Sequence, residues 1–206
     1  MKKMLECTIL IVLGSMFAFA QNPTTTTDDY KKFEFYAGYS ANNLLDGHPE
    51  DVEDVNSNST PTYRGWNISG VYNLNRYVGV KADFSGQYKK YTLVETPNRV
   101  RANASFYNYT AGIQVKDNKR SKRFSPFAHA LFGAATSKVK IDLSGFPGAS
   151  SLSESNTGFS MIFGGGLDIK VTKRFSIRAI QADYNPTFIG GSNQNNVRLG
   201  FGIVFH

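Results

Sequence analysis

Six charged side chains recur on segments whose residues alternate in polarity, and they are the strongest candidates for chemistry in this sequence. They are Glu34, Lys81, Asp83, Asp168, Lys170 and Arg198, and the residues that share their face are mostly Gly, Ser, Asn and Gln. Because an isolated charge is costly away from water, acidic and basic groups in such a setting pair with one another. We therefore predict one charge network with a structural role. A small water-filled pore or a proton path is the alternative for the same residues.

A hydrolase is the second chemical hypothesis, because His129 and the Ser and Glu residues could supply a Ser-His-acid set. No spacing singles out a nucleophile, however, and the sequence contains no Gly-x-Ser-x-Gly turn that would expose one. We therefore predict that the chain is not an enzyme and that His129 is an interior packing residue.

A cluster of carboxylates beside His48 could bind Ca²⁺. Its members are Asp46, Glu50, Asp51, Glu53 and Asp54. Their spacing does not match an EF-hand, so an acidic solvated loop is the simpler interpretation. The sequence also lacks phosphate-loop, zinc-finger and dinucleotide motifs. We predict no metal and no cofactor.

Basic residues gather in the short connections and could contact phospholipid headgroups or simply keep the turns solvated. They are Lys116, Lys119, Arg120, Lys122, Arg123, Lys173 and Arg174. The formal net charge of the whole chain is +7. We do not expect nucleic acid as a partner, because the N-terminus indicates an exported protein.

Residues 1–20 have the three parts of a secretory signal peptide. Lys2 and Lys3 precede an apolar run that is too short to anchor the chain, and small residues end the segment. We predict cleavage between Ala20 and Gln21, which removes the one cysteine, Cys7. Residues 21–32 are polar and rich in Thr, and we predict a flexible lead-in.

From residue 33 onward the polarity repeats every two residues, which is typical of β-strands. In the last segment Leu199, Phe201 and Ile203 share one face, while Arg198 and Gly200 share the other. The predicted strands span residues 33–41, 66–72, 78–87, 106–115, 124–141, 159–171, 175–184 and 196–206. The segments 124–141 and 175–184 change parity, which predicts a bulge or a locally apolar interior there.

Short and long connections alternate along the chain. The short ones are residues 73–76, 117–123 and 172–174, and the long ones are residues 42–63, 93–101, 144–156 and 185–195. In an up-and-down meander this alternation places all short turns at one end and all long loops at the other. Eight strands are enough to close a sheet and remove its edges. The predicted fold class is all-β, an eight-stranded antiparallel up-and-down β-barrel.

The glycines on the charged face indicate which side of the sheet lies inside. Glycine weakens a water-facing strand, but inside a narrow barrel it leaves room for long charged side chains. The apolar face then points to lipid, as in a transmembrane barrel. Aromatic residues near the strand ends predict interfacial girdles, namely Phe33, Tyr63, Trp66, Tyr72, Tyr77, Tyr107, Phe159, Phe175 and Phe205. A soluble lipocalin-like carrier, with the apolar face inside, is the alternative.

The signal peptide, the eight amphipathic strands and the alternating last strand resemble the small outer-membrane β-barrel family of OmpA type. The segment 197–205 resembles that family's assembly signal, although His206 follows the terminal Phe205. The resemblance covers residues 33–206 and implies a Gram-negative outer membrane, short turns in the periplasm and long loops outside. It also implies outer-membrane lipid and the barrel assembly machinery as partners. A peptidoglycan-binding domain cannot be carried over, because residues 33–206 are all assigned to the barrel.

The leading functional hypothesis is a monomeric barrel with a structural or surface-interaction role. Loops presented on a rigid scaffold are the usual site of recognition, and residues 42–63 form the longest one. They would contact an extracellular ligand that the sequence does not identify. A narrow pore, a lipid-modifying enzyme and a soluble carrier are the alternatives.

Overall fold

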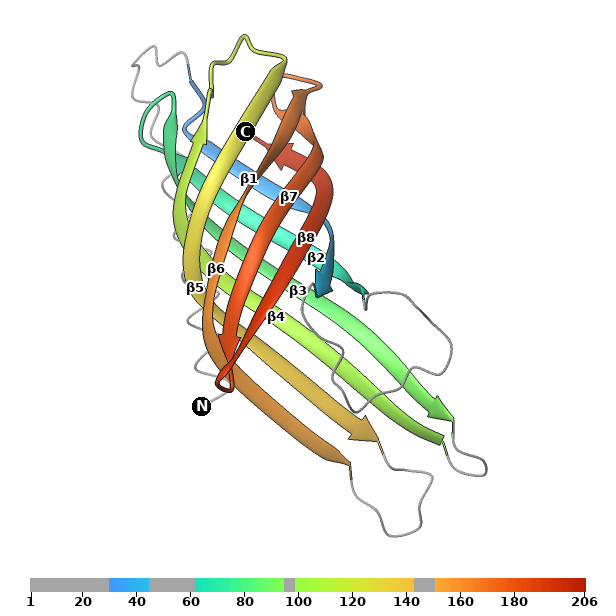
Figure 1. Ribbon diagram of the computed structural model, residues 1–206. Helices are drawn as coiled ribbons and strands as arrows, with labels where there is room; N and C mark the ends of the chain where they lie inside the picture. The colour runs from blue at the N-terminus through green and yellow to red at the C-terminus, as the bar shows by residue number, and fades with distance from the viewer. Residues whose placement is uncertain (1–29, 45–61, 95–98, 143–150) are drawn as a thin grey trace, which may run out of the picture.

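The computed structural model describes residues 30–44, 62–94, 99–142 and 151–206 of the chain. It contains eight strands: β1 (Phe33–Leu44), β2 (Thr62–Asn73), β3 (Val78–Val94), β4 (Arg99–Lys116), β5 (Phe124–Asp142), β6 (Leu152–Lys170), β7 (Phe175–Ile189) and β8 (Ser192–Phe205). Each strand pairs antiparallel with the next, and β8 pairs with β1 to close the barrel (Figure 1). The predicted eight-stranded up-and-down barrel is confirmed.

The apolar side chains of the strands point outward. In β8, Phe201 is 59% exposed and Ile203 is 49% exposed. Arg198 lies on the other face of the strand and is buried in the barrel interior. In β2 three of the four buried residues, Asn67, Ser69 and Asn73, are polar, and Val71 is the fourth. A lipocalin-like carrier requires the opposite orientation, so that alternative is wrong.

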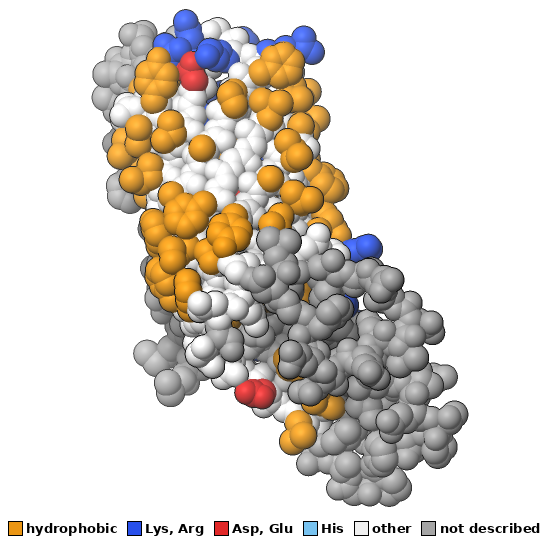
Figure 2. Space-filling view, in the orientation of Figure 1, with side chains coloured by type: hydrophobic (Ala, Val, Ile, Leu, Met, Phe, Trp, Pro, Cys, Tyr) orange, Lys and Arg blue, Asp and Glu red, His pale blue; other side chains and the backbone are white. Residues whose placement is uncertain are grey.

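The outer surface is divided into zones along the barrel axis. Figure 2 shows apolar side chains scattered over the barrel wall and Lys and Arg side chains gathered at the end where the short turns lie. This arrangement suits a wall in contact with lipid and one end at the headgroups. Among the described residues, no helix is long and apolar enough to cross a membrane.

Four strands extend beyond the others at the loop end. Strands β3 to β6 have 17, 18, 19 and 19 residues, whereas β1 and β2 have 12 each. The β2–β3 pairing stops at Arg64 and Tyr88, and the β6–β7 pairing starts at Phe159 and Phe188. Beyond those points the four strands pair only with one another and form what we call the projecting sheet (Figure 1).

Three of the predicted long connections are shorter than expected, because they contain strand residues. The predicted connection 42–63 includes residues 42–44 of β1 and 62–63 of β2. The predicted connection 93–101 includes Val94 of β3 and Arg99 of β4. The predicted connection 144–156 includes the first residues of β6, from Leu152. Gly, Pro, Asn and Ser residues in these stretches suggested loops, but the pairing of neighbouring strands keeps residues 93–94, 99–101 and 152–156 extended.

The predicted long connection 185–195 is wrong. Strand β7 continues to Ile189 and β8 starts at Ser192, so the connection is a tight turn at Gly190 and Gly191. Both glycines have positive φ, 63° and 80°, which a two-residue hairpin turn of type I′ requires at its two central positions. The Asn, Pro and Ser residues on either side belong to paired strands.

The two predicted changes of parity have different causes. In β7 the register shifts between Arg178 and Gln181, so a bulge turns both of these side chains inward. Strand β5 pairs without interruption, and its inner face is locally apolar at Phe127 and Leu131. One strand therefore has the predicted bulge and the other has the predicted apolar interior.

The end of the predicted lead-in is part of the barrel end. Tyr30 forms a bridge with Lys119, and the carbonyl oxygen of Lys31 accepts a hydrogen bond from Asn73 Nδ2 at 2.7 Å. Residues 30–32 therefore contact the short-turn end of the barrel. The signal peptide, its cleavage point at Ala20 and Gln21, the rest of the lead-in, and residues 45–61 lie outside the described residues.

Candidate functional site

Arg198 lies at the centre of the barrel interior and binds two carboxylates from different strands. Its Nη1 donates to Asp83 Oδ1 of β3 at 2.9 Å, and its Nη2 donates to Asp183 Oδ2 of β7 at 2.6 Å. Nη1 also donates to Ser85 Oγ at 3.1 Å. The Arg198 side chain is 1% exposed. One guanidinium of β8 therefore connects strands that are not neighbours in the sheet.

Lys81 and His129 complete this group, which we call the central cluster. Lys81 Nζ lies 3.5 Å from Asp83 Oδ2, and His129 Nε2 lies 3.0 Å from Asp183 Oδ1. Lys81 Nζ and His129 Nδ1 are 3.3 Å apart. The central cluster therefore comprises three basic groups around two carboxylates, with contributions from β3, β5, β7 and β8.

A second group, the proximal cluster, lies nearer the short turns. Lys116 Nζ donates to Glu34 Oε2 at 2.6 Å and to Asp168 Oδ2 at 2.7 Å. Arg178 holds the same Asp168 with two hydrogen bonds of 2.8 and 3.1 Å. These four residues come from β1, β4, β6 and β7.

Gln181 connects the two clusters. Its Oε1 accepts from Arg178 Nη1 at 2.8 Å, and its Nε2 donates to Asp183 Oδ2 at 2.6 Å. The Arg178 guanidinium also lies over two rings, 4.4 Å from the Tyr36 centroid and 4.1 Å from the Phe127 centroid. The interior from its centre to the short-turn end is therefore filled by a continuous set of hydrogen-bonded and stacked side chains.

The charges of the two clusters balance. Among the described interior residues, four carboxylates (Glu34, Asp83, Asp168, Asp183) face four Lys and Arg side chains (Lys81, Lys116, Arg178, Arg198). An eight-stranded barrel is just wide enough to hold its own side chains. This geometry favours a plugged interior, in which the side chains join the strands, and it argues against an open channel.

Toward the loop end the described interior combines uncharged polar side chains with a small apolar group of Phe106, Ala135 and Ile189. Ser160 Oγ lies 2.9 Å from Asn108 Oδ1 and 3.0 Å from Asn185 Oδ1. Gln87 Nε2 donates to Ser40 Oγ at 2.9 Å. Neutral amides and hydroxyls can satisfy one another in a narrow space without counterions.

Five of the six charged residues that the sequence singled out lie in these clusters: Glu34, Lys81, Asp83, Asp168 and Arg198. Lys170 does not. It is partly exposed at the mouth of the barrel, where its Nζ donates to the Arg120 carbonyl oxygen at 2.6 Å. Its position one residue before the turn explains the difference, since the strand leaves the interior there.

Three members of the clusters were missed in the sequence. Lys116 has the inward parity of Gln114, but the predicted strand stopped at Val115. Arg178 and Asp183 lie on either side of the β7 bulge, so simple alternation cannot place both inside. Extending β4 by one residue would have found Lys116.

The histidines do not form a catalytic triad in the described part of the chain. His129 contacts Lys81 and Asp183 rather than a Ser hydroxyl. Ser176 Oγ lies 2.8 Å from His206 Nε2, but Lys31 Nζ shares that nitrogen, and His206 Nδ1 has no hydrogen-bond partner. No group of three metal-ligating side chains occurs among the described residues. The acidic residues 46–54 lie outside them.

Aromatic rings gather at two levels of the outer wall. Near the short turns, Phe33 packs on Tyr72 with centroids 5.1 Å apart, and Phe175 packs on Phe205 at 4.6 Å. Near the loop end the pairs are Tyr88–Tyr107 at 5.9 Å and Phe159–Phe188 at 6.2 Å, and Trp66 Nε1 donates to Tyr88 Oη at 3.4 Å. These positions match the two interfacial girdles of a membrane barrel.

Comparison with known families gives one match over nearly the whole chain. A family model described as the outer membrane protein β-barrel domain matches residues 8–205. No curated protein sequence matches the chain.

Solved structures with similar folds include the attachment invasion locus protein Ail of Yersinia pestis. Ail in complex with the heparin analogue sucrose octasulfate has a TM-score of 0.57 and 22% sequence identity, over 84% of this chain and 97% of Ail. Another crystal structure of Ail has a TM-score of 0.53 and 24% identity, with the same coverage of both chains. At this level of identity the likeness shows the fold alone.

Proposed function

The chain belongs to the outer membrane protein β-barrel family, and from this premise we propose that it is a non-enzymatic barrel that binds an extracellular polyanion with its projecting sheet. The barrel lies in the bacterial outer membrane. In this proposal the ion-paired interior holds the strands together, and recognition occurs on the part of the sheet that rises beyond the outer aromatic girdle.

The observation that carries the proposal is a set of exposed lysines in register on the outward face of the projecting sheet. Lys90 of β3 is opposite Asn103 of β4, and Asn103 is opposite Lys140 of β5. Lys138 is two residues before Lys140 and therefore lies on the same face. On β6, Ser153 is opposite Lys140 and Ser155 is opposite Lys138. The lysines and both serines are exposed.

The chemistry of this face suits a sulfated or otherwise acidic polysaccharide. Ammonium groups attract an extended anion over its length, and neighbouring hydroxyl and amide groups can bind its oxygens. Glu154 is on the opposite face of β6, so the lysines are not neutralised by it. Ail was solved in complex with a heparin analogue, and heparin is therefore the polyanion that we propose to test on this chain.

The test is a binding titration with a heparin fragment of defined length on the refolded protein in detergent micelles. The variant K90Q/K138Q/K140Q should lose about tenfold or more in affinity, since each lysine contributes a few tenths of a kcal/mol or more. The matched control is R123Q/K173Q/R174Q, which removes the same charge at the opposite end. It should bind nearly as well as the wild type.

Equal losses in both triple variants would mean that binding follows net charge and not this face, which would overturn the proposal. Absence of saturable binding by the wild type at low ionic strength would do the same, because salt screening is weakest there.

We also propose that the barrel is a monomer whose β8 serves as the signal for the assembly machinery. Its outward residues Leu199, Phe201 and Ile203 are exposed, and β8 forms the closing seam with β1. Replacing Phe205 by Ala should lower the amount of barrel in the outer membrane of producing cells, with refolding of the purified variant unchanged. Size measurement in detergent tests the monomer.

A further inference from the structure

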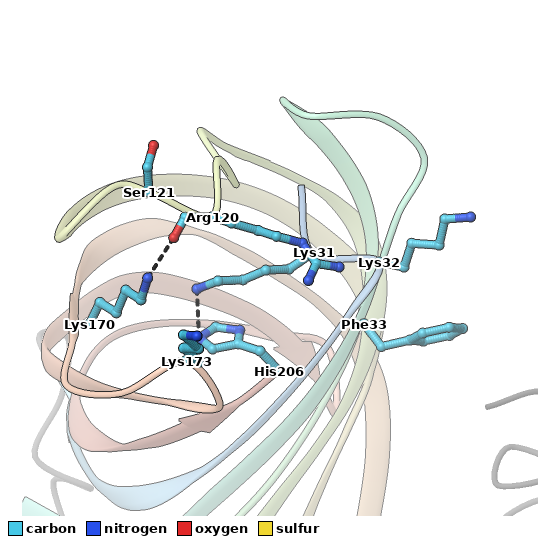
Figure 3. Close-up of a pocket in the computed structure, with 8 residues that line it drawn as sticks. All are labelled: Lys31, Lys32, Phe33, Arg120, Ser121, Lys170, Lys173 and His206. Carbon is cyan, nitrogen blue, oxygen red and sulfur yellow. Dashed lines mark hydrogen bonds between the residues drawn. The ribbon is translucent and has the colours of Figure 1, made fainter. Parts of the chain in front are cut away.

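A cavity of about 660 Å³ at the short-turn end is lined mainly by basic side chains. The lining residues are Lys31, Lys32, Phe33, Arg120, Ser121, Lys170, Lys173 and His206, with no acidic residue among them (Figure 3). They come from the segment before β1, the start of β1, the β4–β5 turn, the end of β6, the β6–β7 turn and the residue after β8. Segments far apart in sequence thus converge on one opening.

Backbone contacts fix the wall of this cavity. The carbonyl oxygen of Lys32 accepts from the Asn73 amide at 2.8 Å, and the His206 amide donates to the Arg174 carbonyl oxygen at 3.0 Å. Arg120 Nε donates to the Tyr30 carbonyl oxygen at 3.3 Å. The basic side chains are therefore presented from an ordered frame rather than from loose turns.

Lys31, Lys170 and His206 lie over the barrel opening in Figure 3, whereas Lys32 and Phe33 point away from it. Lys31 Nζ is 2.9 Å from His206 Nε2, and Lys170 Nζ donates to the Arg120 carbonyl oxygen at 2.6 Å. Each of these bonds uses one of the three ammonium donors of its lysine. Both lysines keep donors for a further acceptor.

The carboxylates nearest to the cavity are already paired. Glu34 and Asp168 accept from Lys116 beneath it, and Asp117 accepts from Arg76 and Lys122 beside it.

The cavity therefore has a surplus of positive charge. In agreement, burial and the neighbouring Lys116 lower the pKa of Lys31 to about 8. An anion placed here would stabilise the charged lysine.

We propose that this cavity binds a phosphate-bearing anion from the periplasmic side, either the headgroup of an inner-leaflet phospholipid or a free phosphate ester. A phosphate group offers several acceptor oxygens to converging ammonium and guanidinium donors. Phe33 belongs to the aromatic girdle at this end and packs on Tyr72, so the cavity lies at headgroup depth. The binding site does not depend on the polysaccharide face at the other end of the barrel.

The first arm of the test uses a soluble anion. Inorganic pyrophosphate is titrated into the full-length refolded protein in phosphatidylcholine nanodiscs. The backbone amide NMR signals of Ser121 and His206 and the imidazole signals of His206 are followed. Saturable shifts are expected, together with a rise in the pKa of Lys31. The variant K31Q/K173Q should lose about tenfold in affinity, as expected for two charge-assisted contacts.

The second arm tests the lipid source. Native mass spectrometry after mild delipidation should detect one retained phosphatidylglycerol on the wild type and none on K31Q/K173Q. The matched control K138Q/K140Q removes the same charge at the other end and should behave as the wild type in both arms. If K31Q/K173Q does not fold, K173Q alone replaces it, because Lys173 lies in a turn outside the strands.

Saturation by pyrophosphate with no retained lipid shows that the cavity takes a free phosphate-bearing anion. Retained phosphatidylglycerol without saturation by pyrophosphate shows that it takes a lipid headgroup. The proposal is overturned if neither arm gives saturable binding, or if K31Q/K173Q and K138Q/K140Q lose binding equally. A normal result for heparin with a negative result here would separate this proposal from the previous one.

Discussion

At the scale of single residues, Arg198 is the interaction on which the interior depends most. It lies between Asp83 and Asp183, and both carboxylates are fully buried. Two ionised carboxylates repel strongly in a low-dielectric interior, so a cation between them allows both to stay charged. Removing the cation leaves Lys81 and His129 as the basic groups beside Asp83 and Asp183, whereas removing one carboxylate leaves Arg198 paired with the other.

We predict that R198Q lowers the free energy of unfolding by about 3–5 kcal/mol, the usual cost of breaking a buried ion pair. Urea unfolding followed by the fluorescence of Trp66, the one tryptophan, measures it. The matched control is R64Q at an exposed position of β2, which should change stability by about 0.5 kcal/mol or less. Equal effects of the two variants would contradict the prediction. Adding D183N to R198Q should recover part of the loss.

His206, at the short-turn end of the barrel, makes the free energy of unfolding depend on pH. Burial and the neighbouring Lys31 and Lys116 lower its pKa from 6.5 to about 4, against the opposite effect of Glu34 and Asp168. Between these values the unfolded chain binds more protons than the folded chain, so stability is complete above about pH 6.5 and falls as pH drops toward 4. The urea midpoint should therefore be lower at pH 5 than at pH 7.

The variant H206N should remove this part of the pH dependence. Hydrogen bonds from Arg76 and Lys122 also hold the pKa of Asp117 well below its usual range, and that group loses its stabilising charge in the same direction below about pH 4. The comparison is therefore made between pH 5 and pH 7, where Asp117 stays ionised. An unchanged pH 5 to pH 7 difference in H206N would count against the assignment.

At the scale of elements, the β1–β8 seam depends on two small residues. Gly38 and Gly202 are directly opposite in register. A Cβ on Gly202 would collide with the Ala37 carbonyl oxygen and lie 2.9 Å from the Tyr36 ring. The space that these glycines leave is occupied by the Tyr36 ring, on which Arg178 stacks.

We predict that G202A lowers stability by about 1–3 kcal/mol, the range for overpacking a tight interior. G70A is the matched control, since a Cβ there points outward and first meets Phe35 at 3.7 Å, an ordinary contact. Refolding yield by heat-modifiable gel migration and urea midpoints give the measurement. Similar midpoints for G202A and G70A would show that the seam tolerates the added methyl group.

How far the sequence predicts these elements depends on the regularity of each strand. Strand β8 alternates throughout, so its inward Arg198 and outward Phe201 follow from the sequence alone. Strand β7 does not, because the bulge between Arg178 and Gln181 reverses parity at a point that alternation cannot locate. Arg178 and Asp183 were missed for this reason.

The ends of strands are harder to predict than their faces. Asn, Pro and Ser in residues 185–195 are turn formers in isolation, yet pairing of β7 with β8 keeps all but the two glycines extended. Lys116 was assigned to a turn because the predicted strand ended one residue early. Pairing with neighbours decides such ends, and a single sequence does not contain that information.

At the scale of the whole molecule, the outer wall defines a depth axis. Phe205 lies at the short-turn end of β8, and Phe201 lies four residues toward the middle on the same face. Each packs against one aromatic ring, Phe205 on Phe175 and Phe201 on Tyr39. The two positions therefore differ mainly in their depth in the bilayer.

We predict that F201K costs about 2–4 kcal/mol in lipid bilayers and F205K about 0–1 kcal/mol, as expected for a cation near the midplane and near the interface. Reversible unfolding in liposomes measures both. Equal costs would mean that this face of β8 does not cross the hydrocarbon core.

Ion conduction distinguishes a plugged barrel from the alternative, a narrow pore. Arg178 and Arg198 are the largest fully buried side chains of the described interior and lie in the two clusters that fill it. The wild type should give no steady current in planar bilayers, because each cluster links non-neighbouring strands across the interior. The variant R178A/R198A, checked for folding by gel migration, should give discrete current steps, since both obstructions lose their central side chain. Steady wild-type channels of one size would show that ions pass the two clusters. The interior would then be a pore whose charged side chains select ions, and the plugged barrel would be wrong.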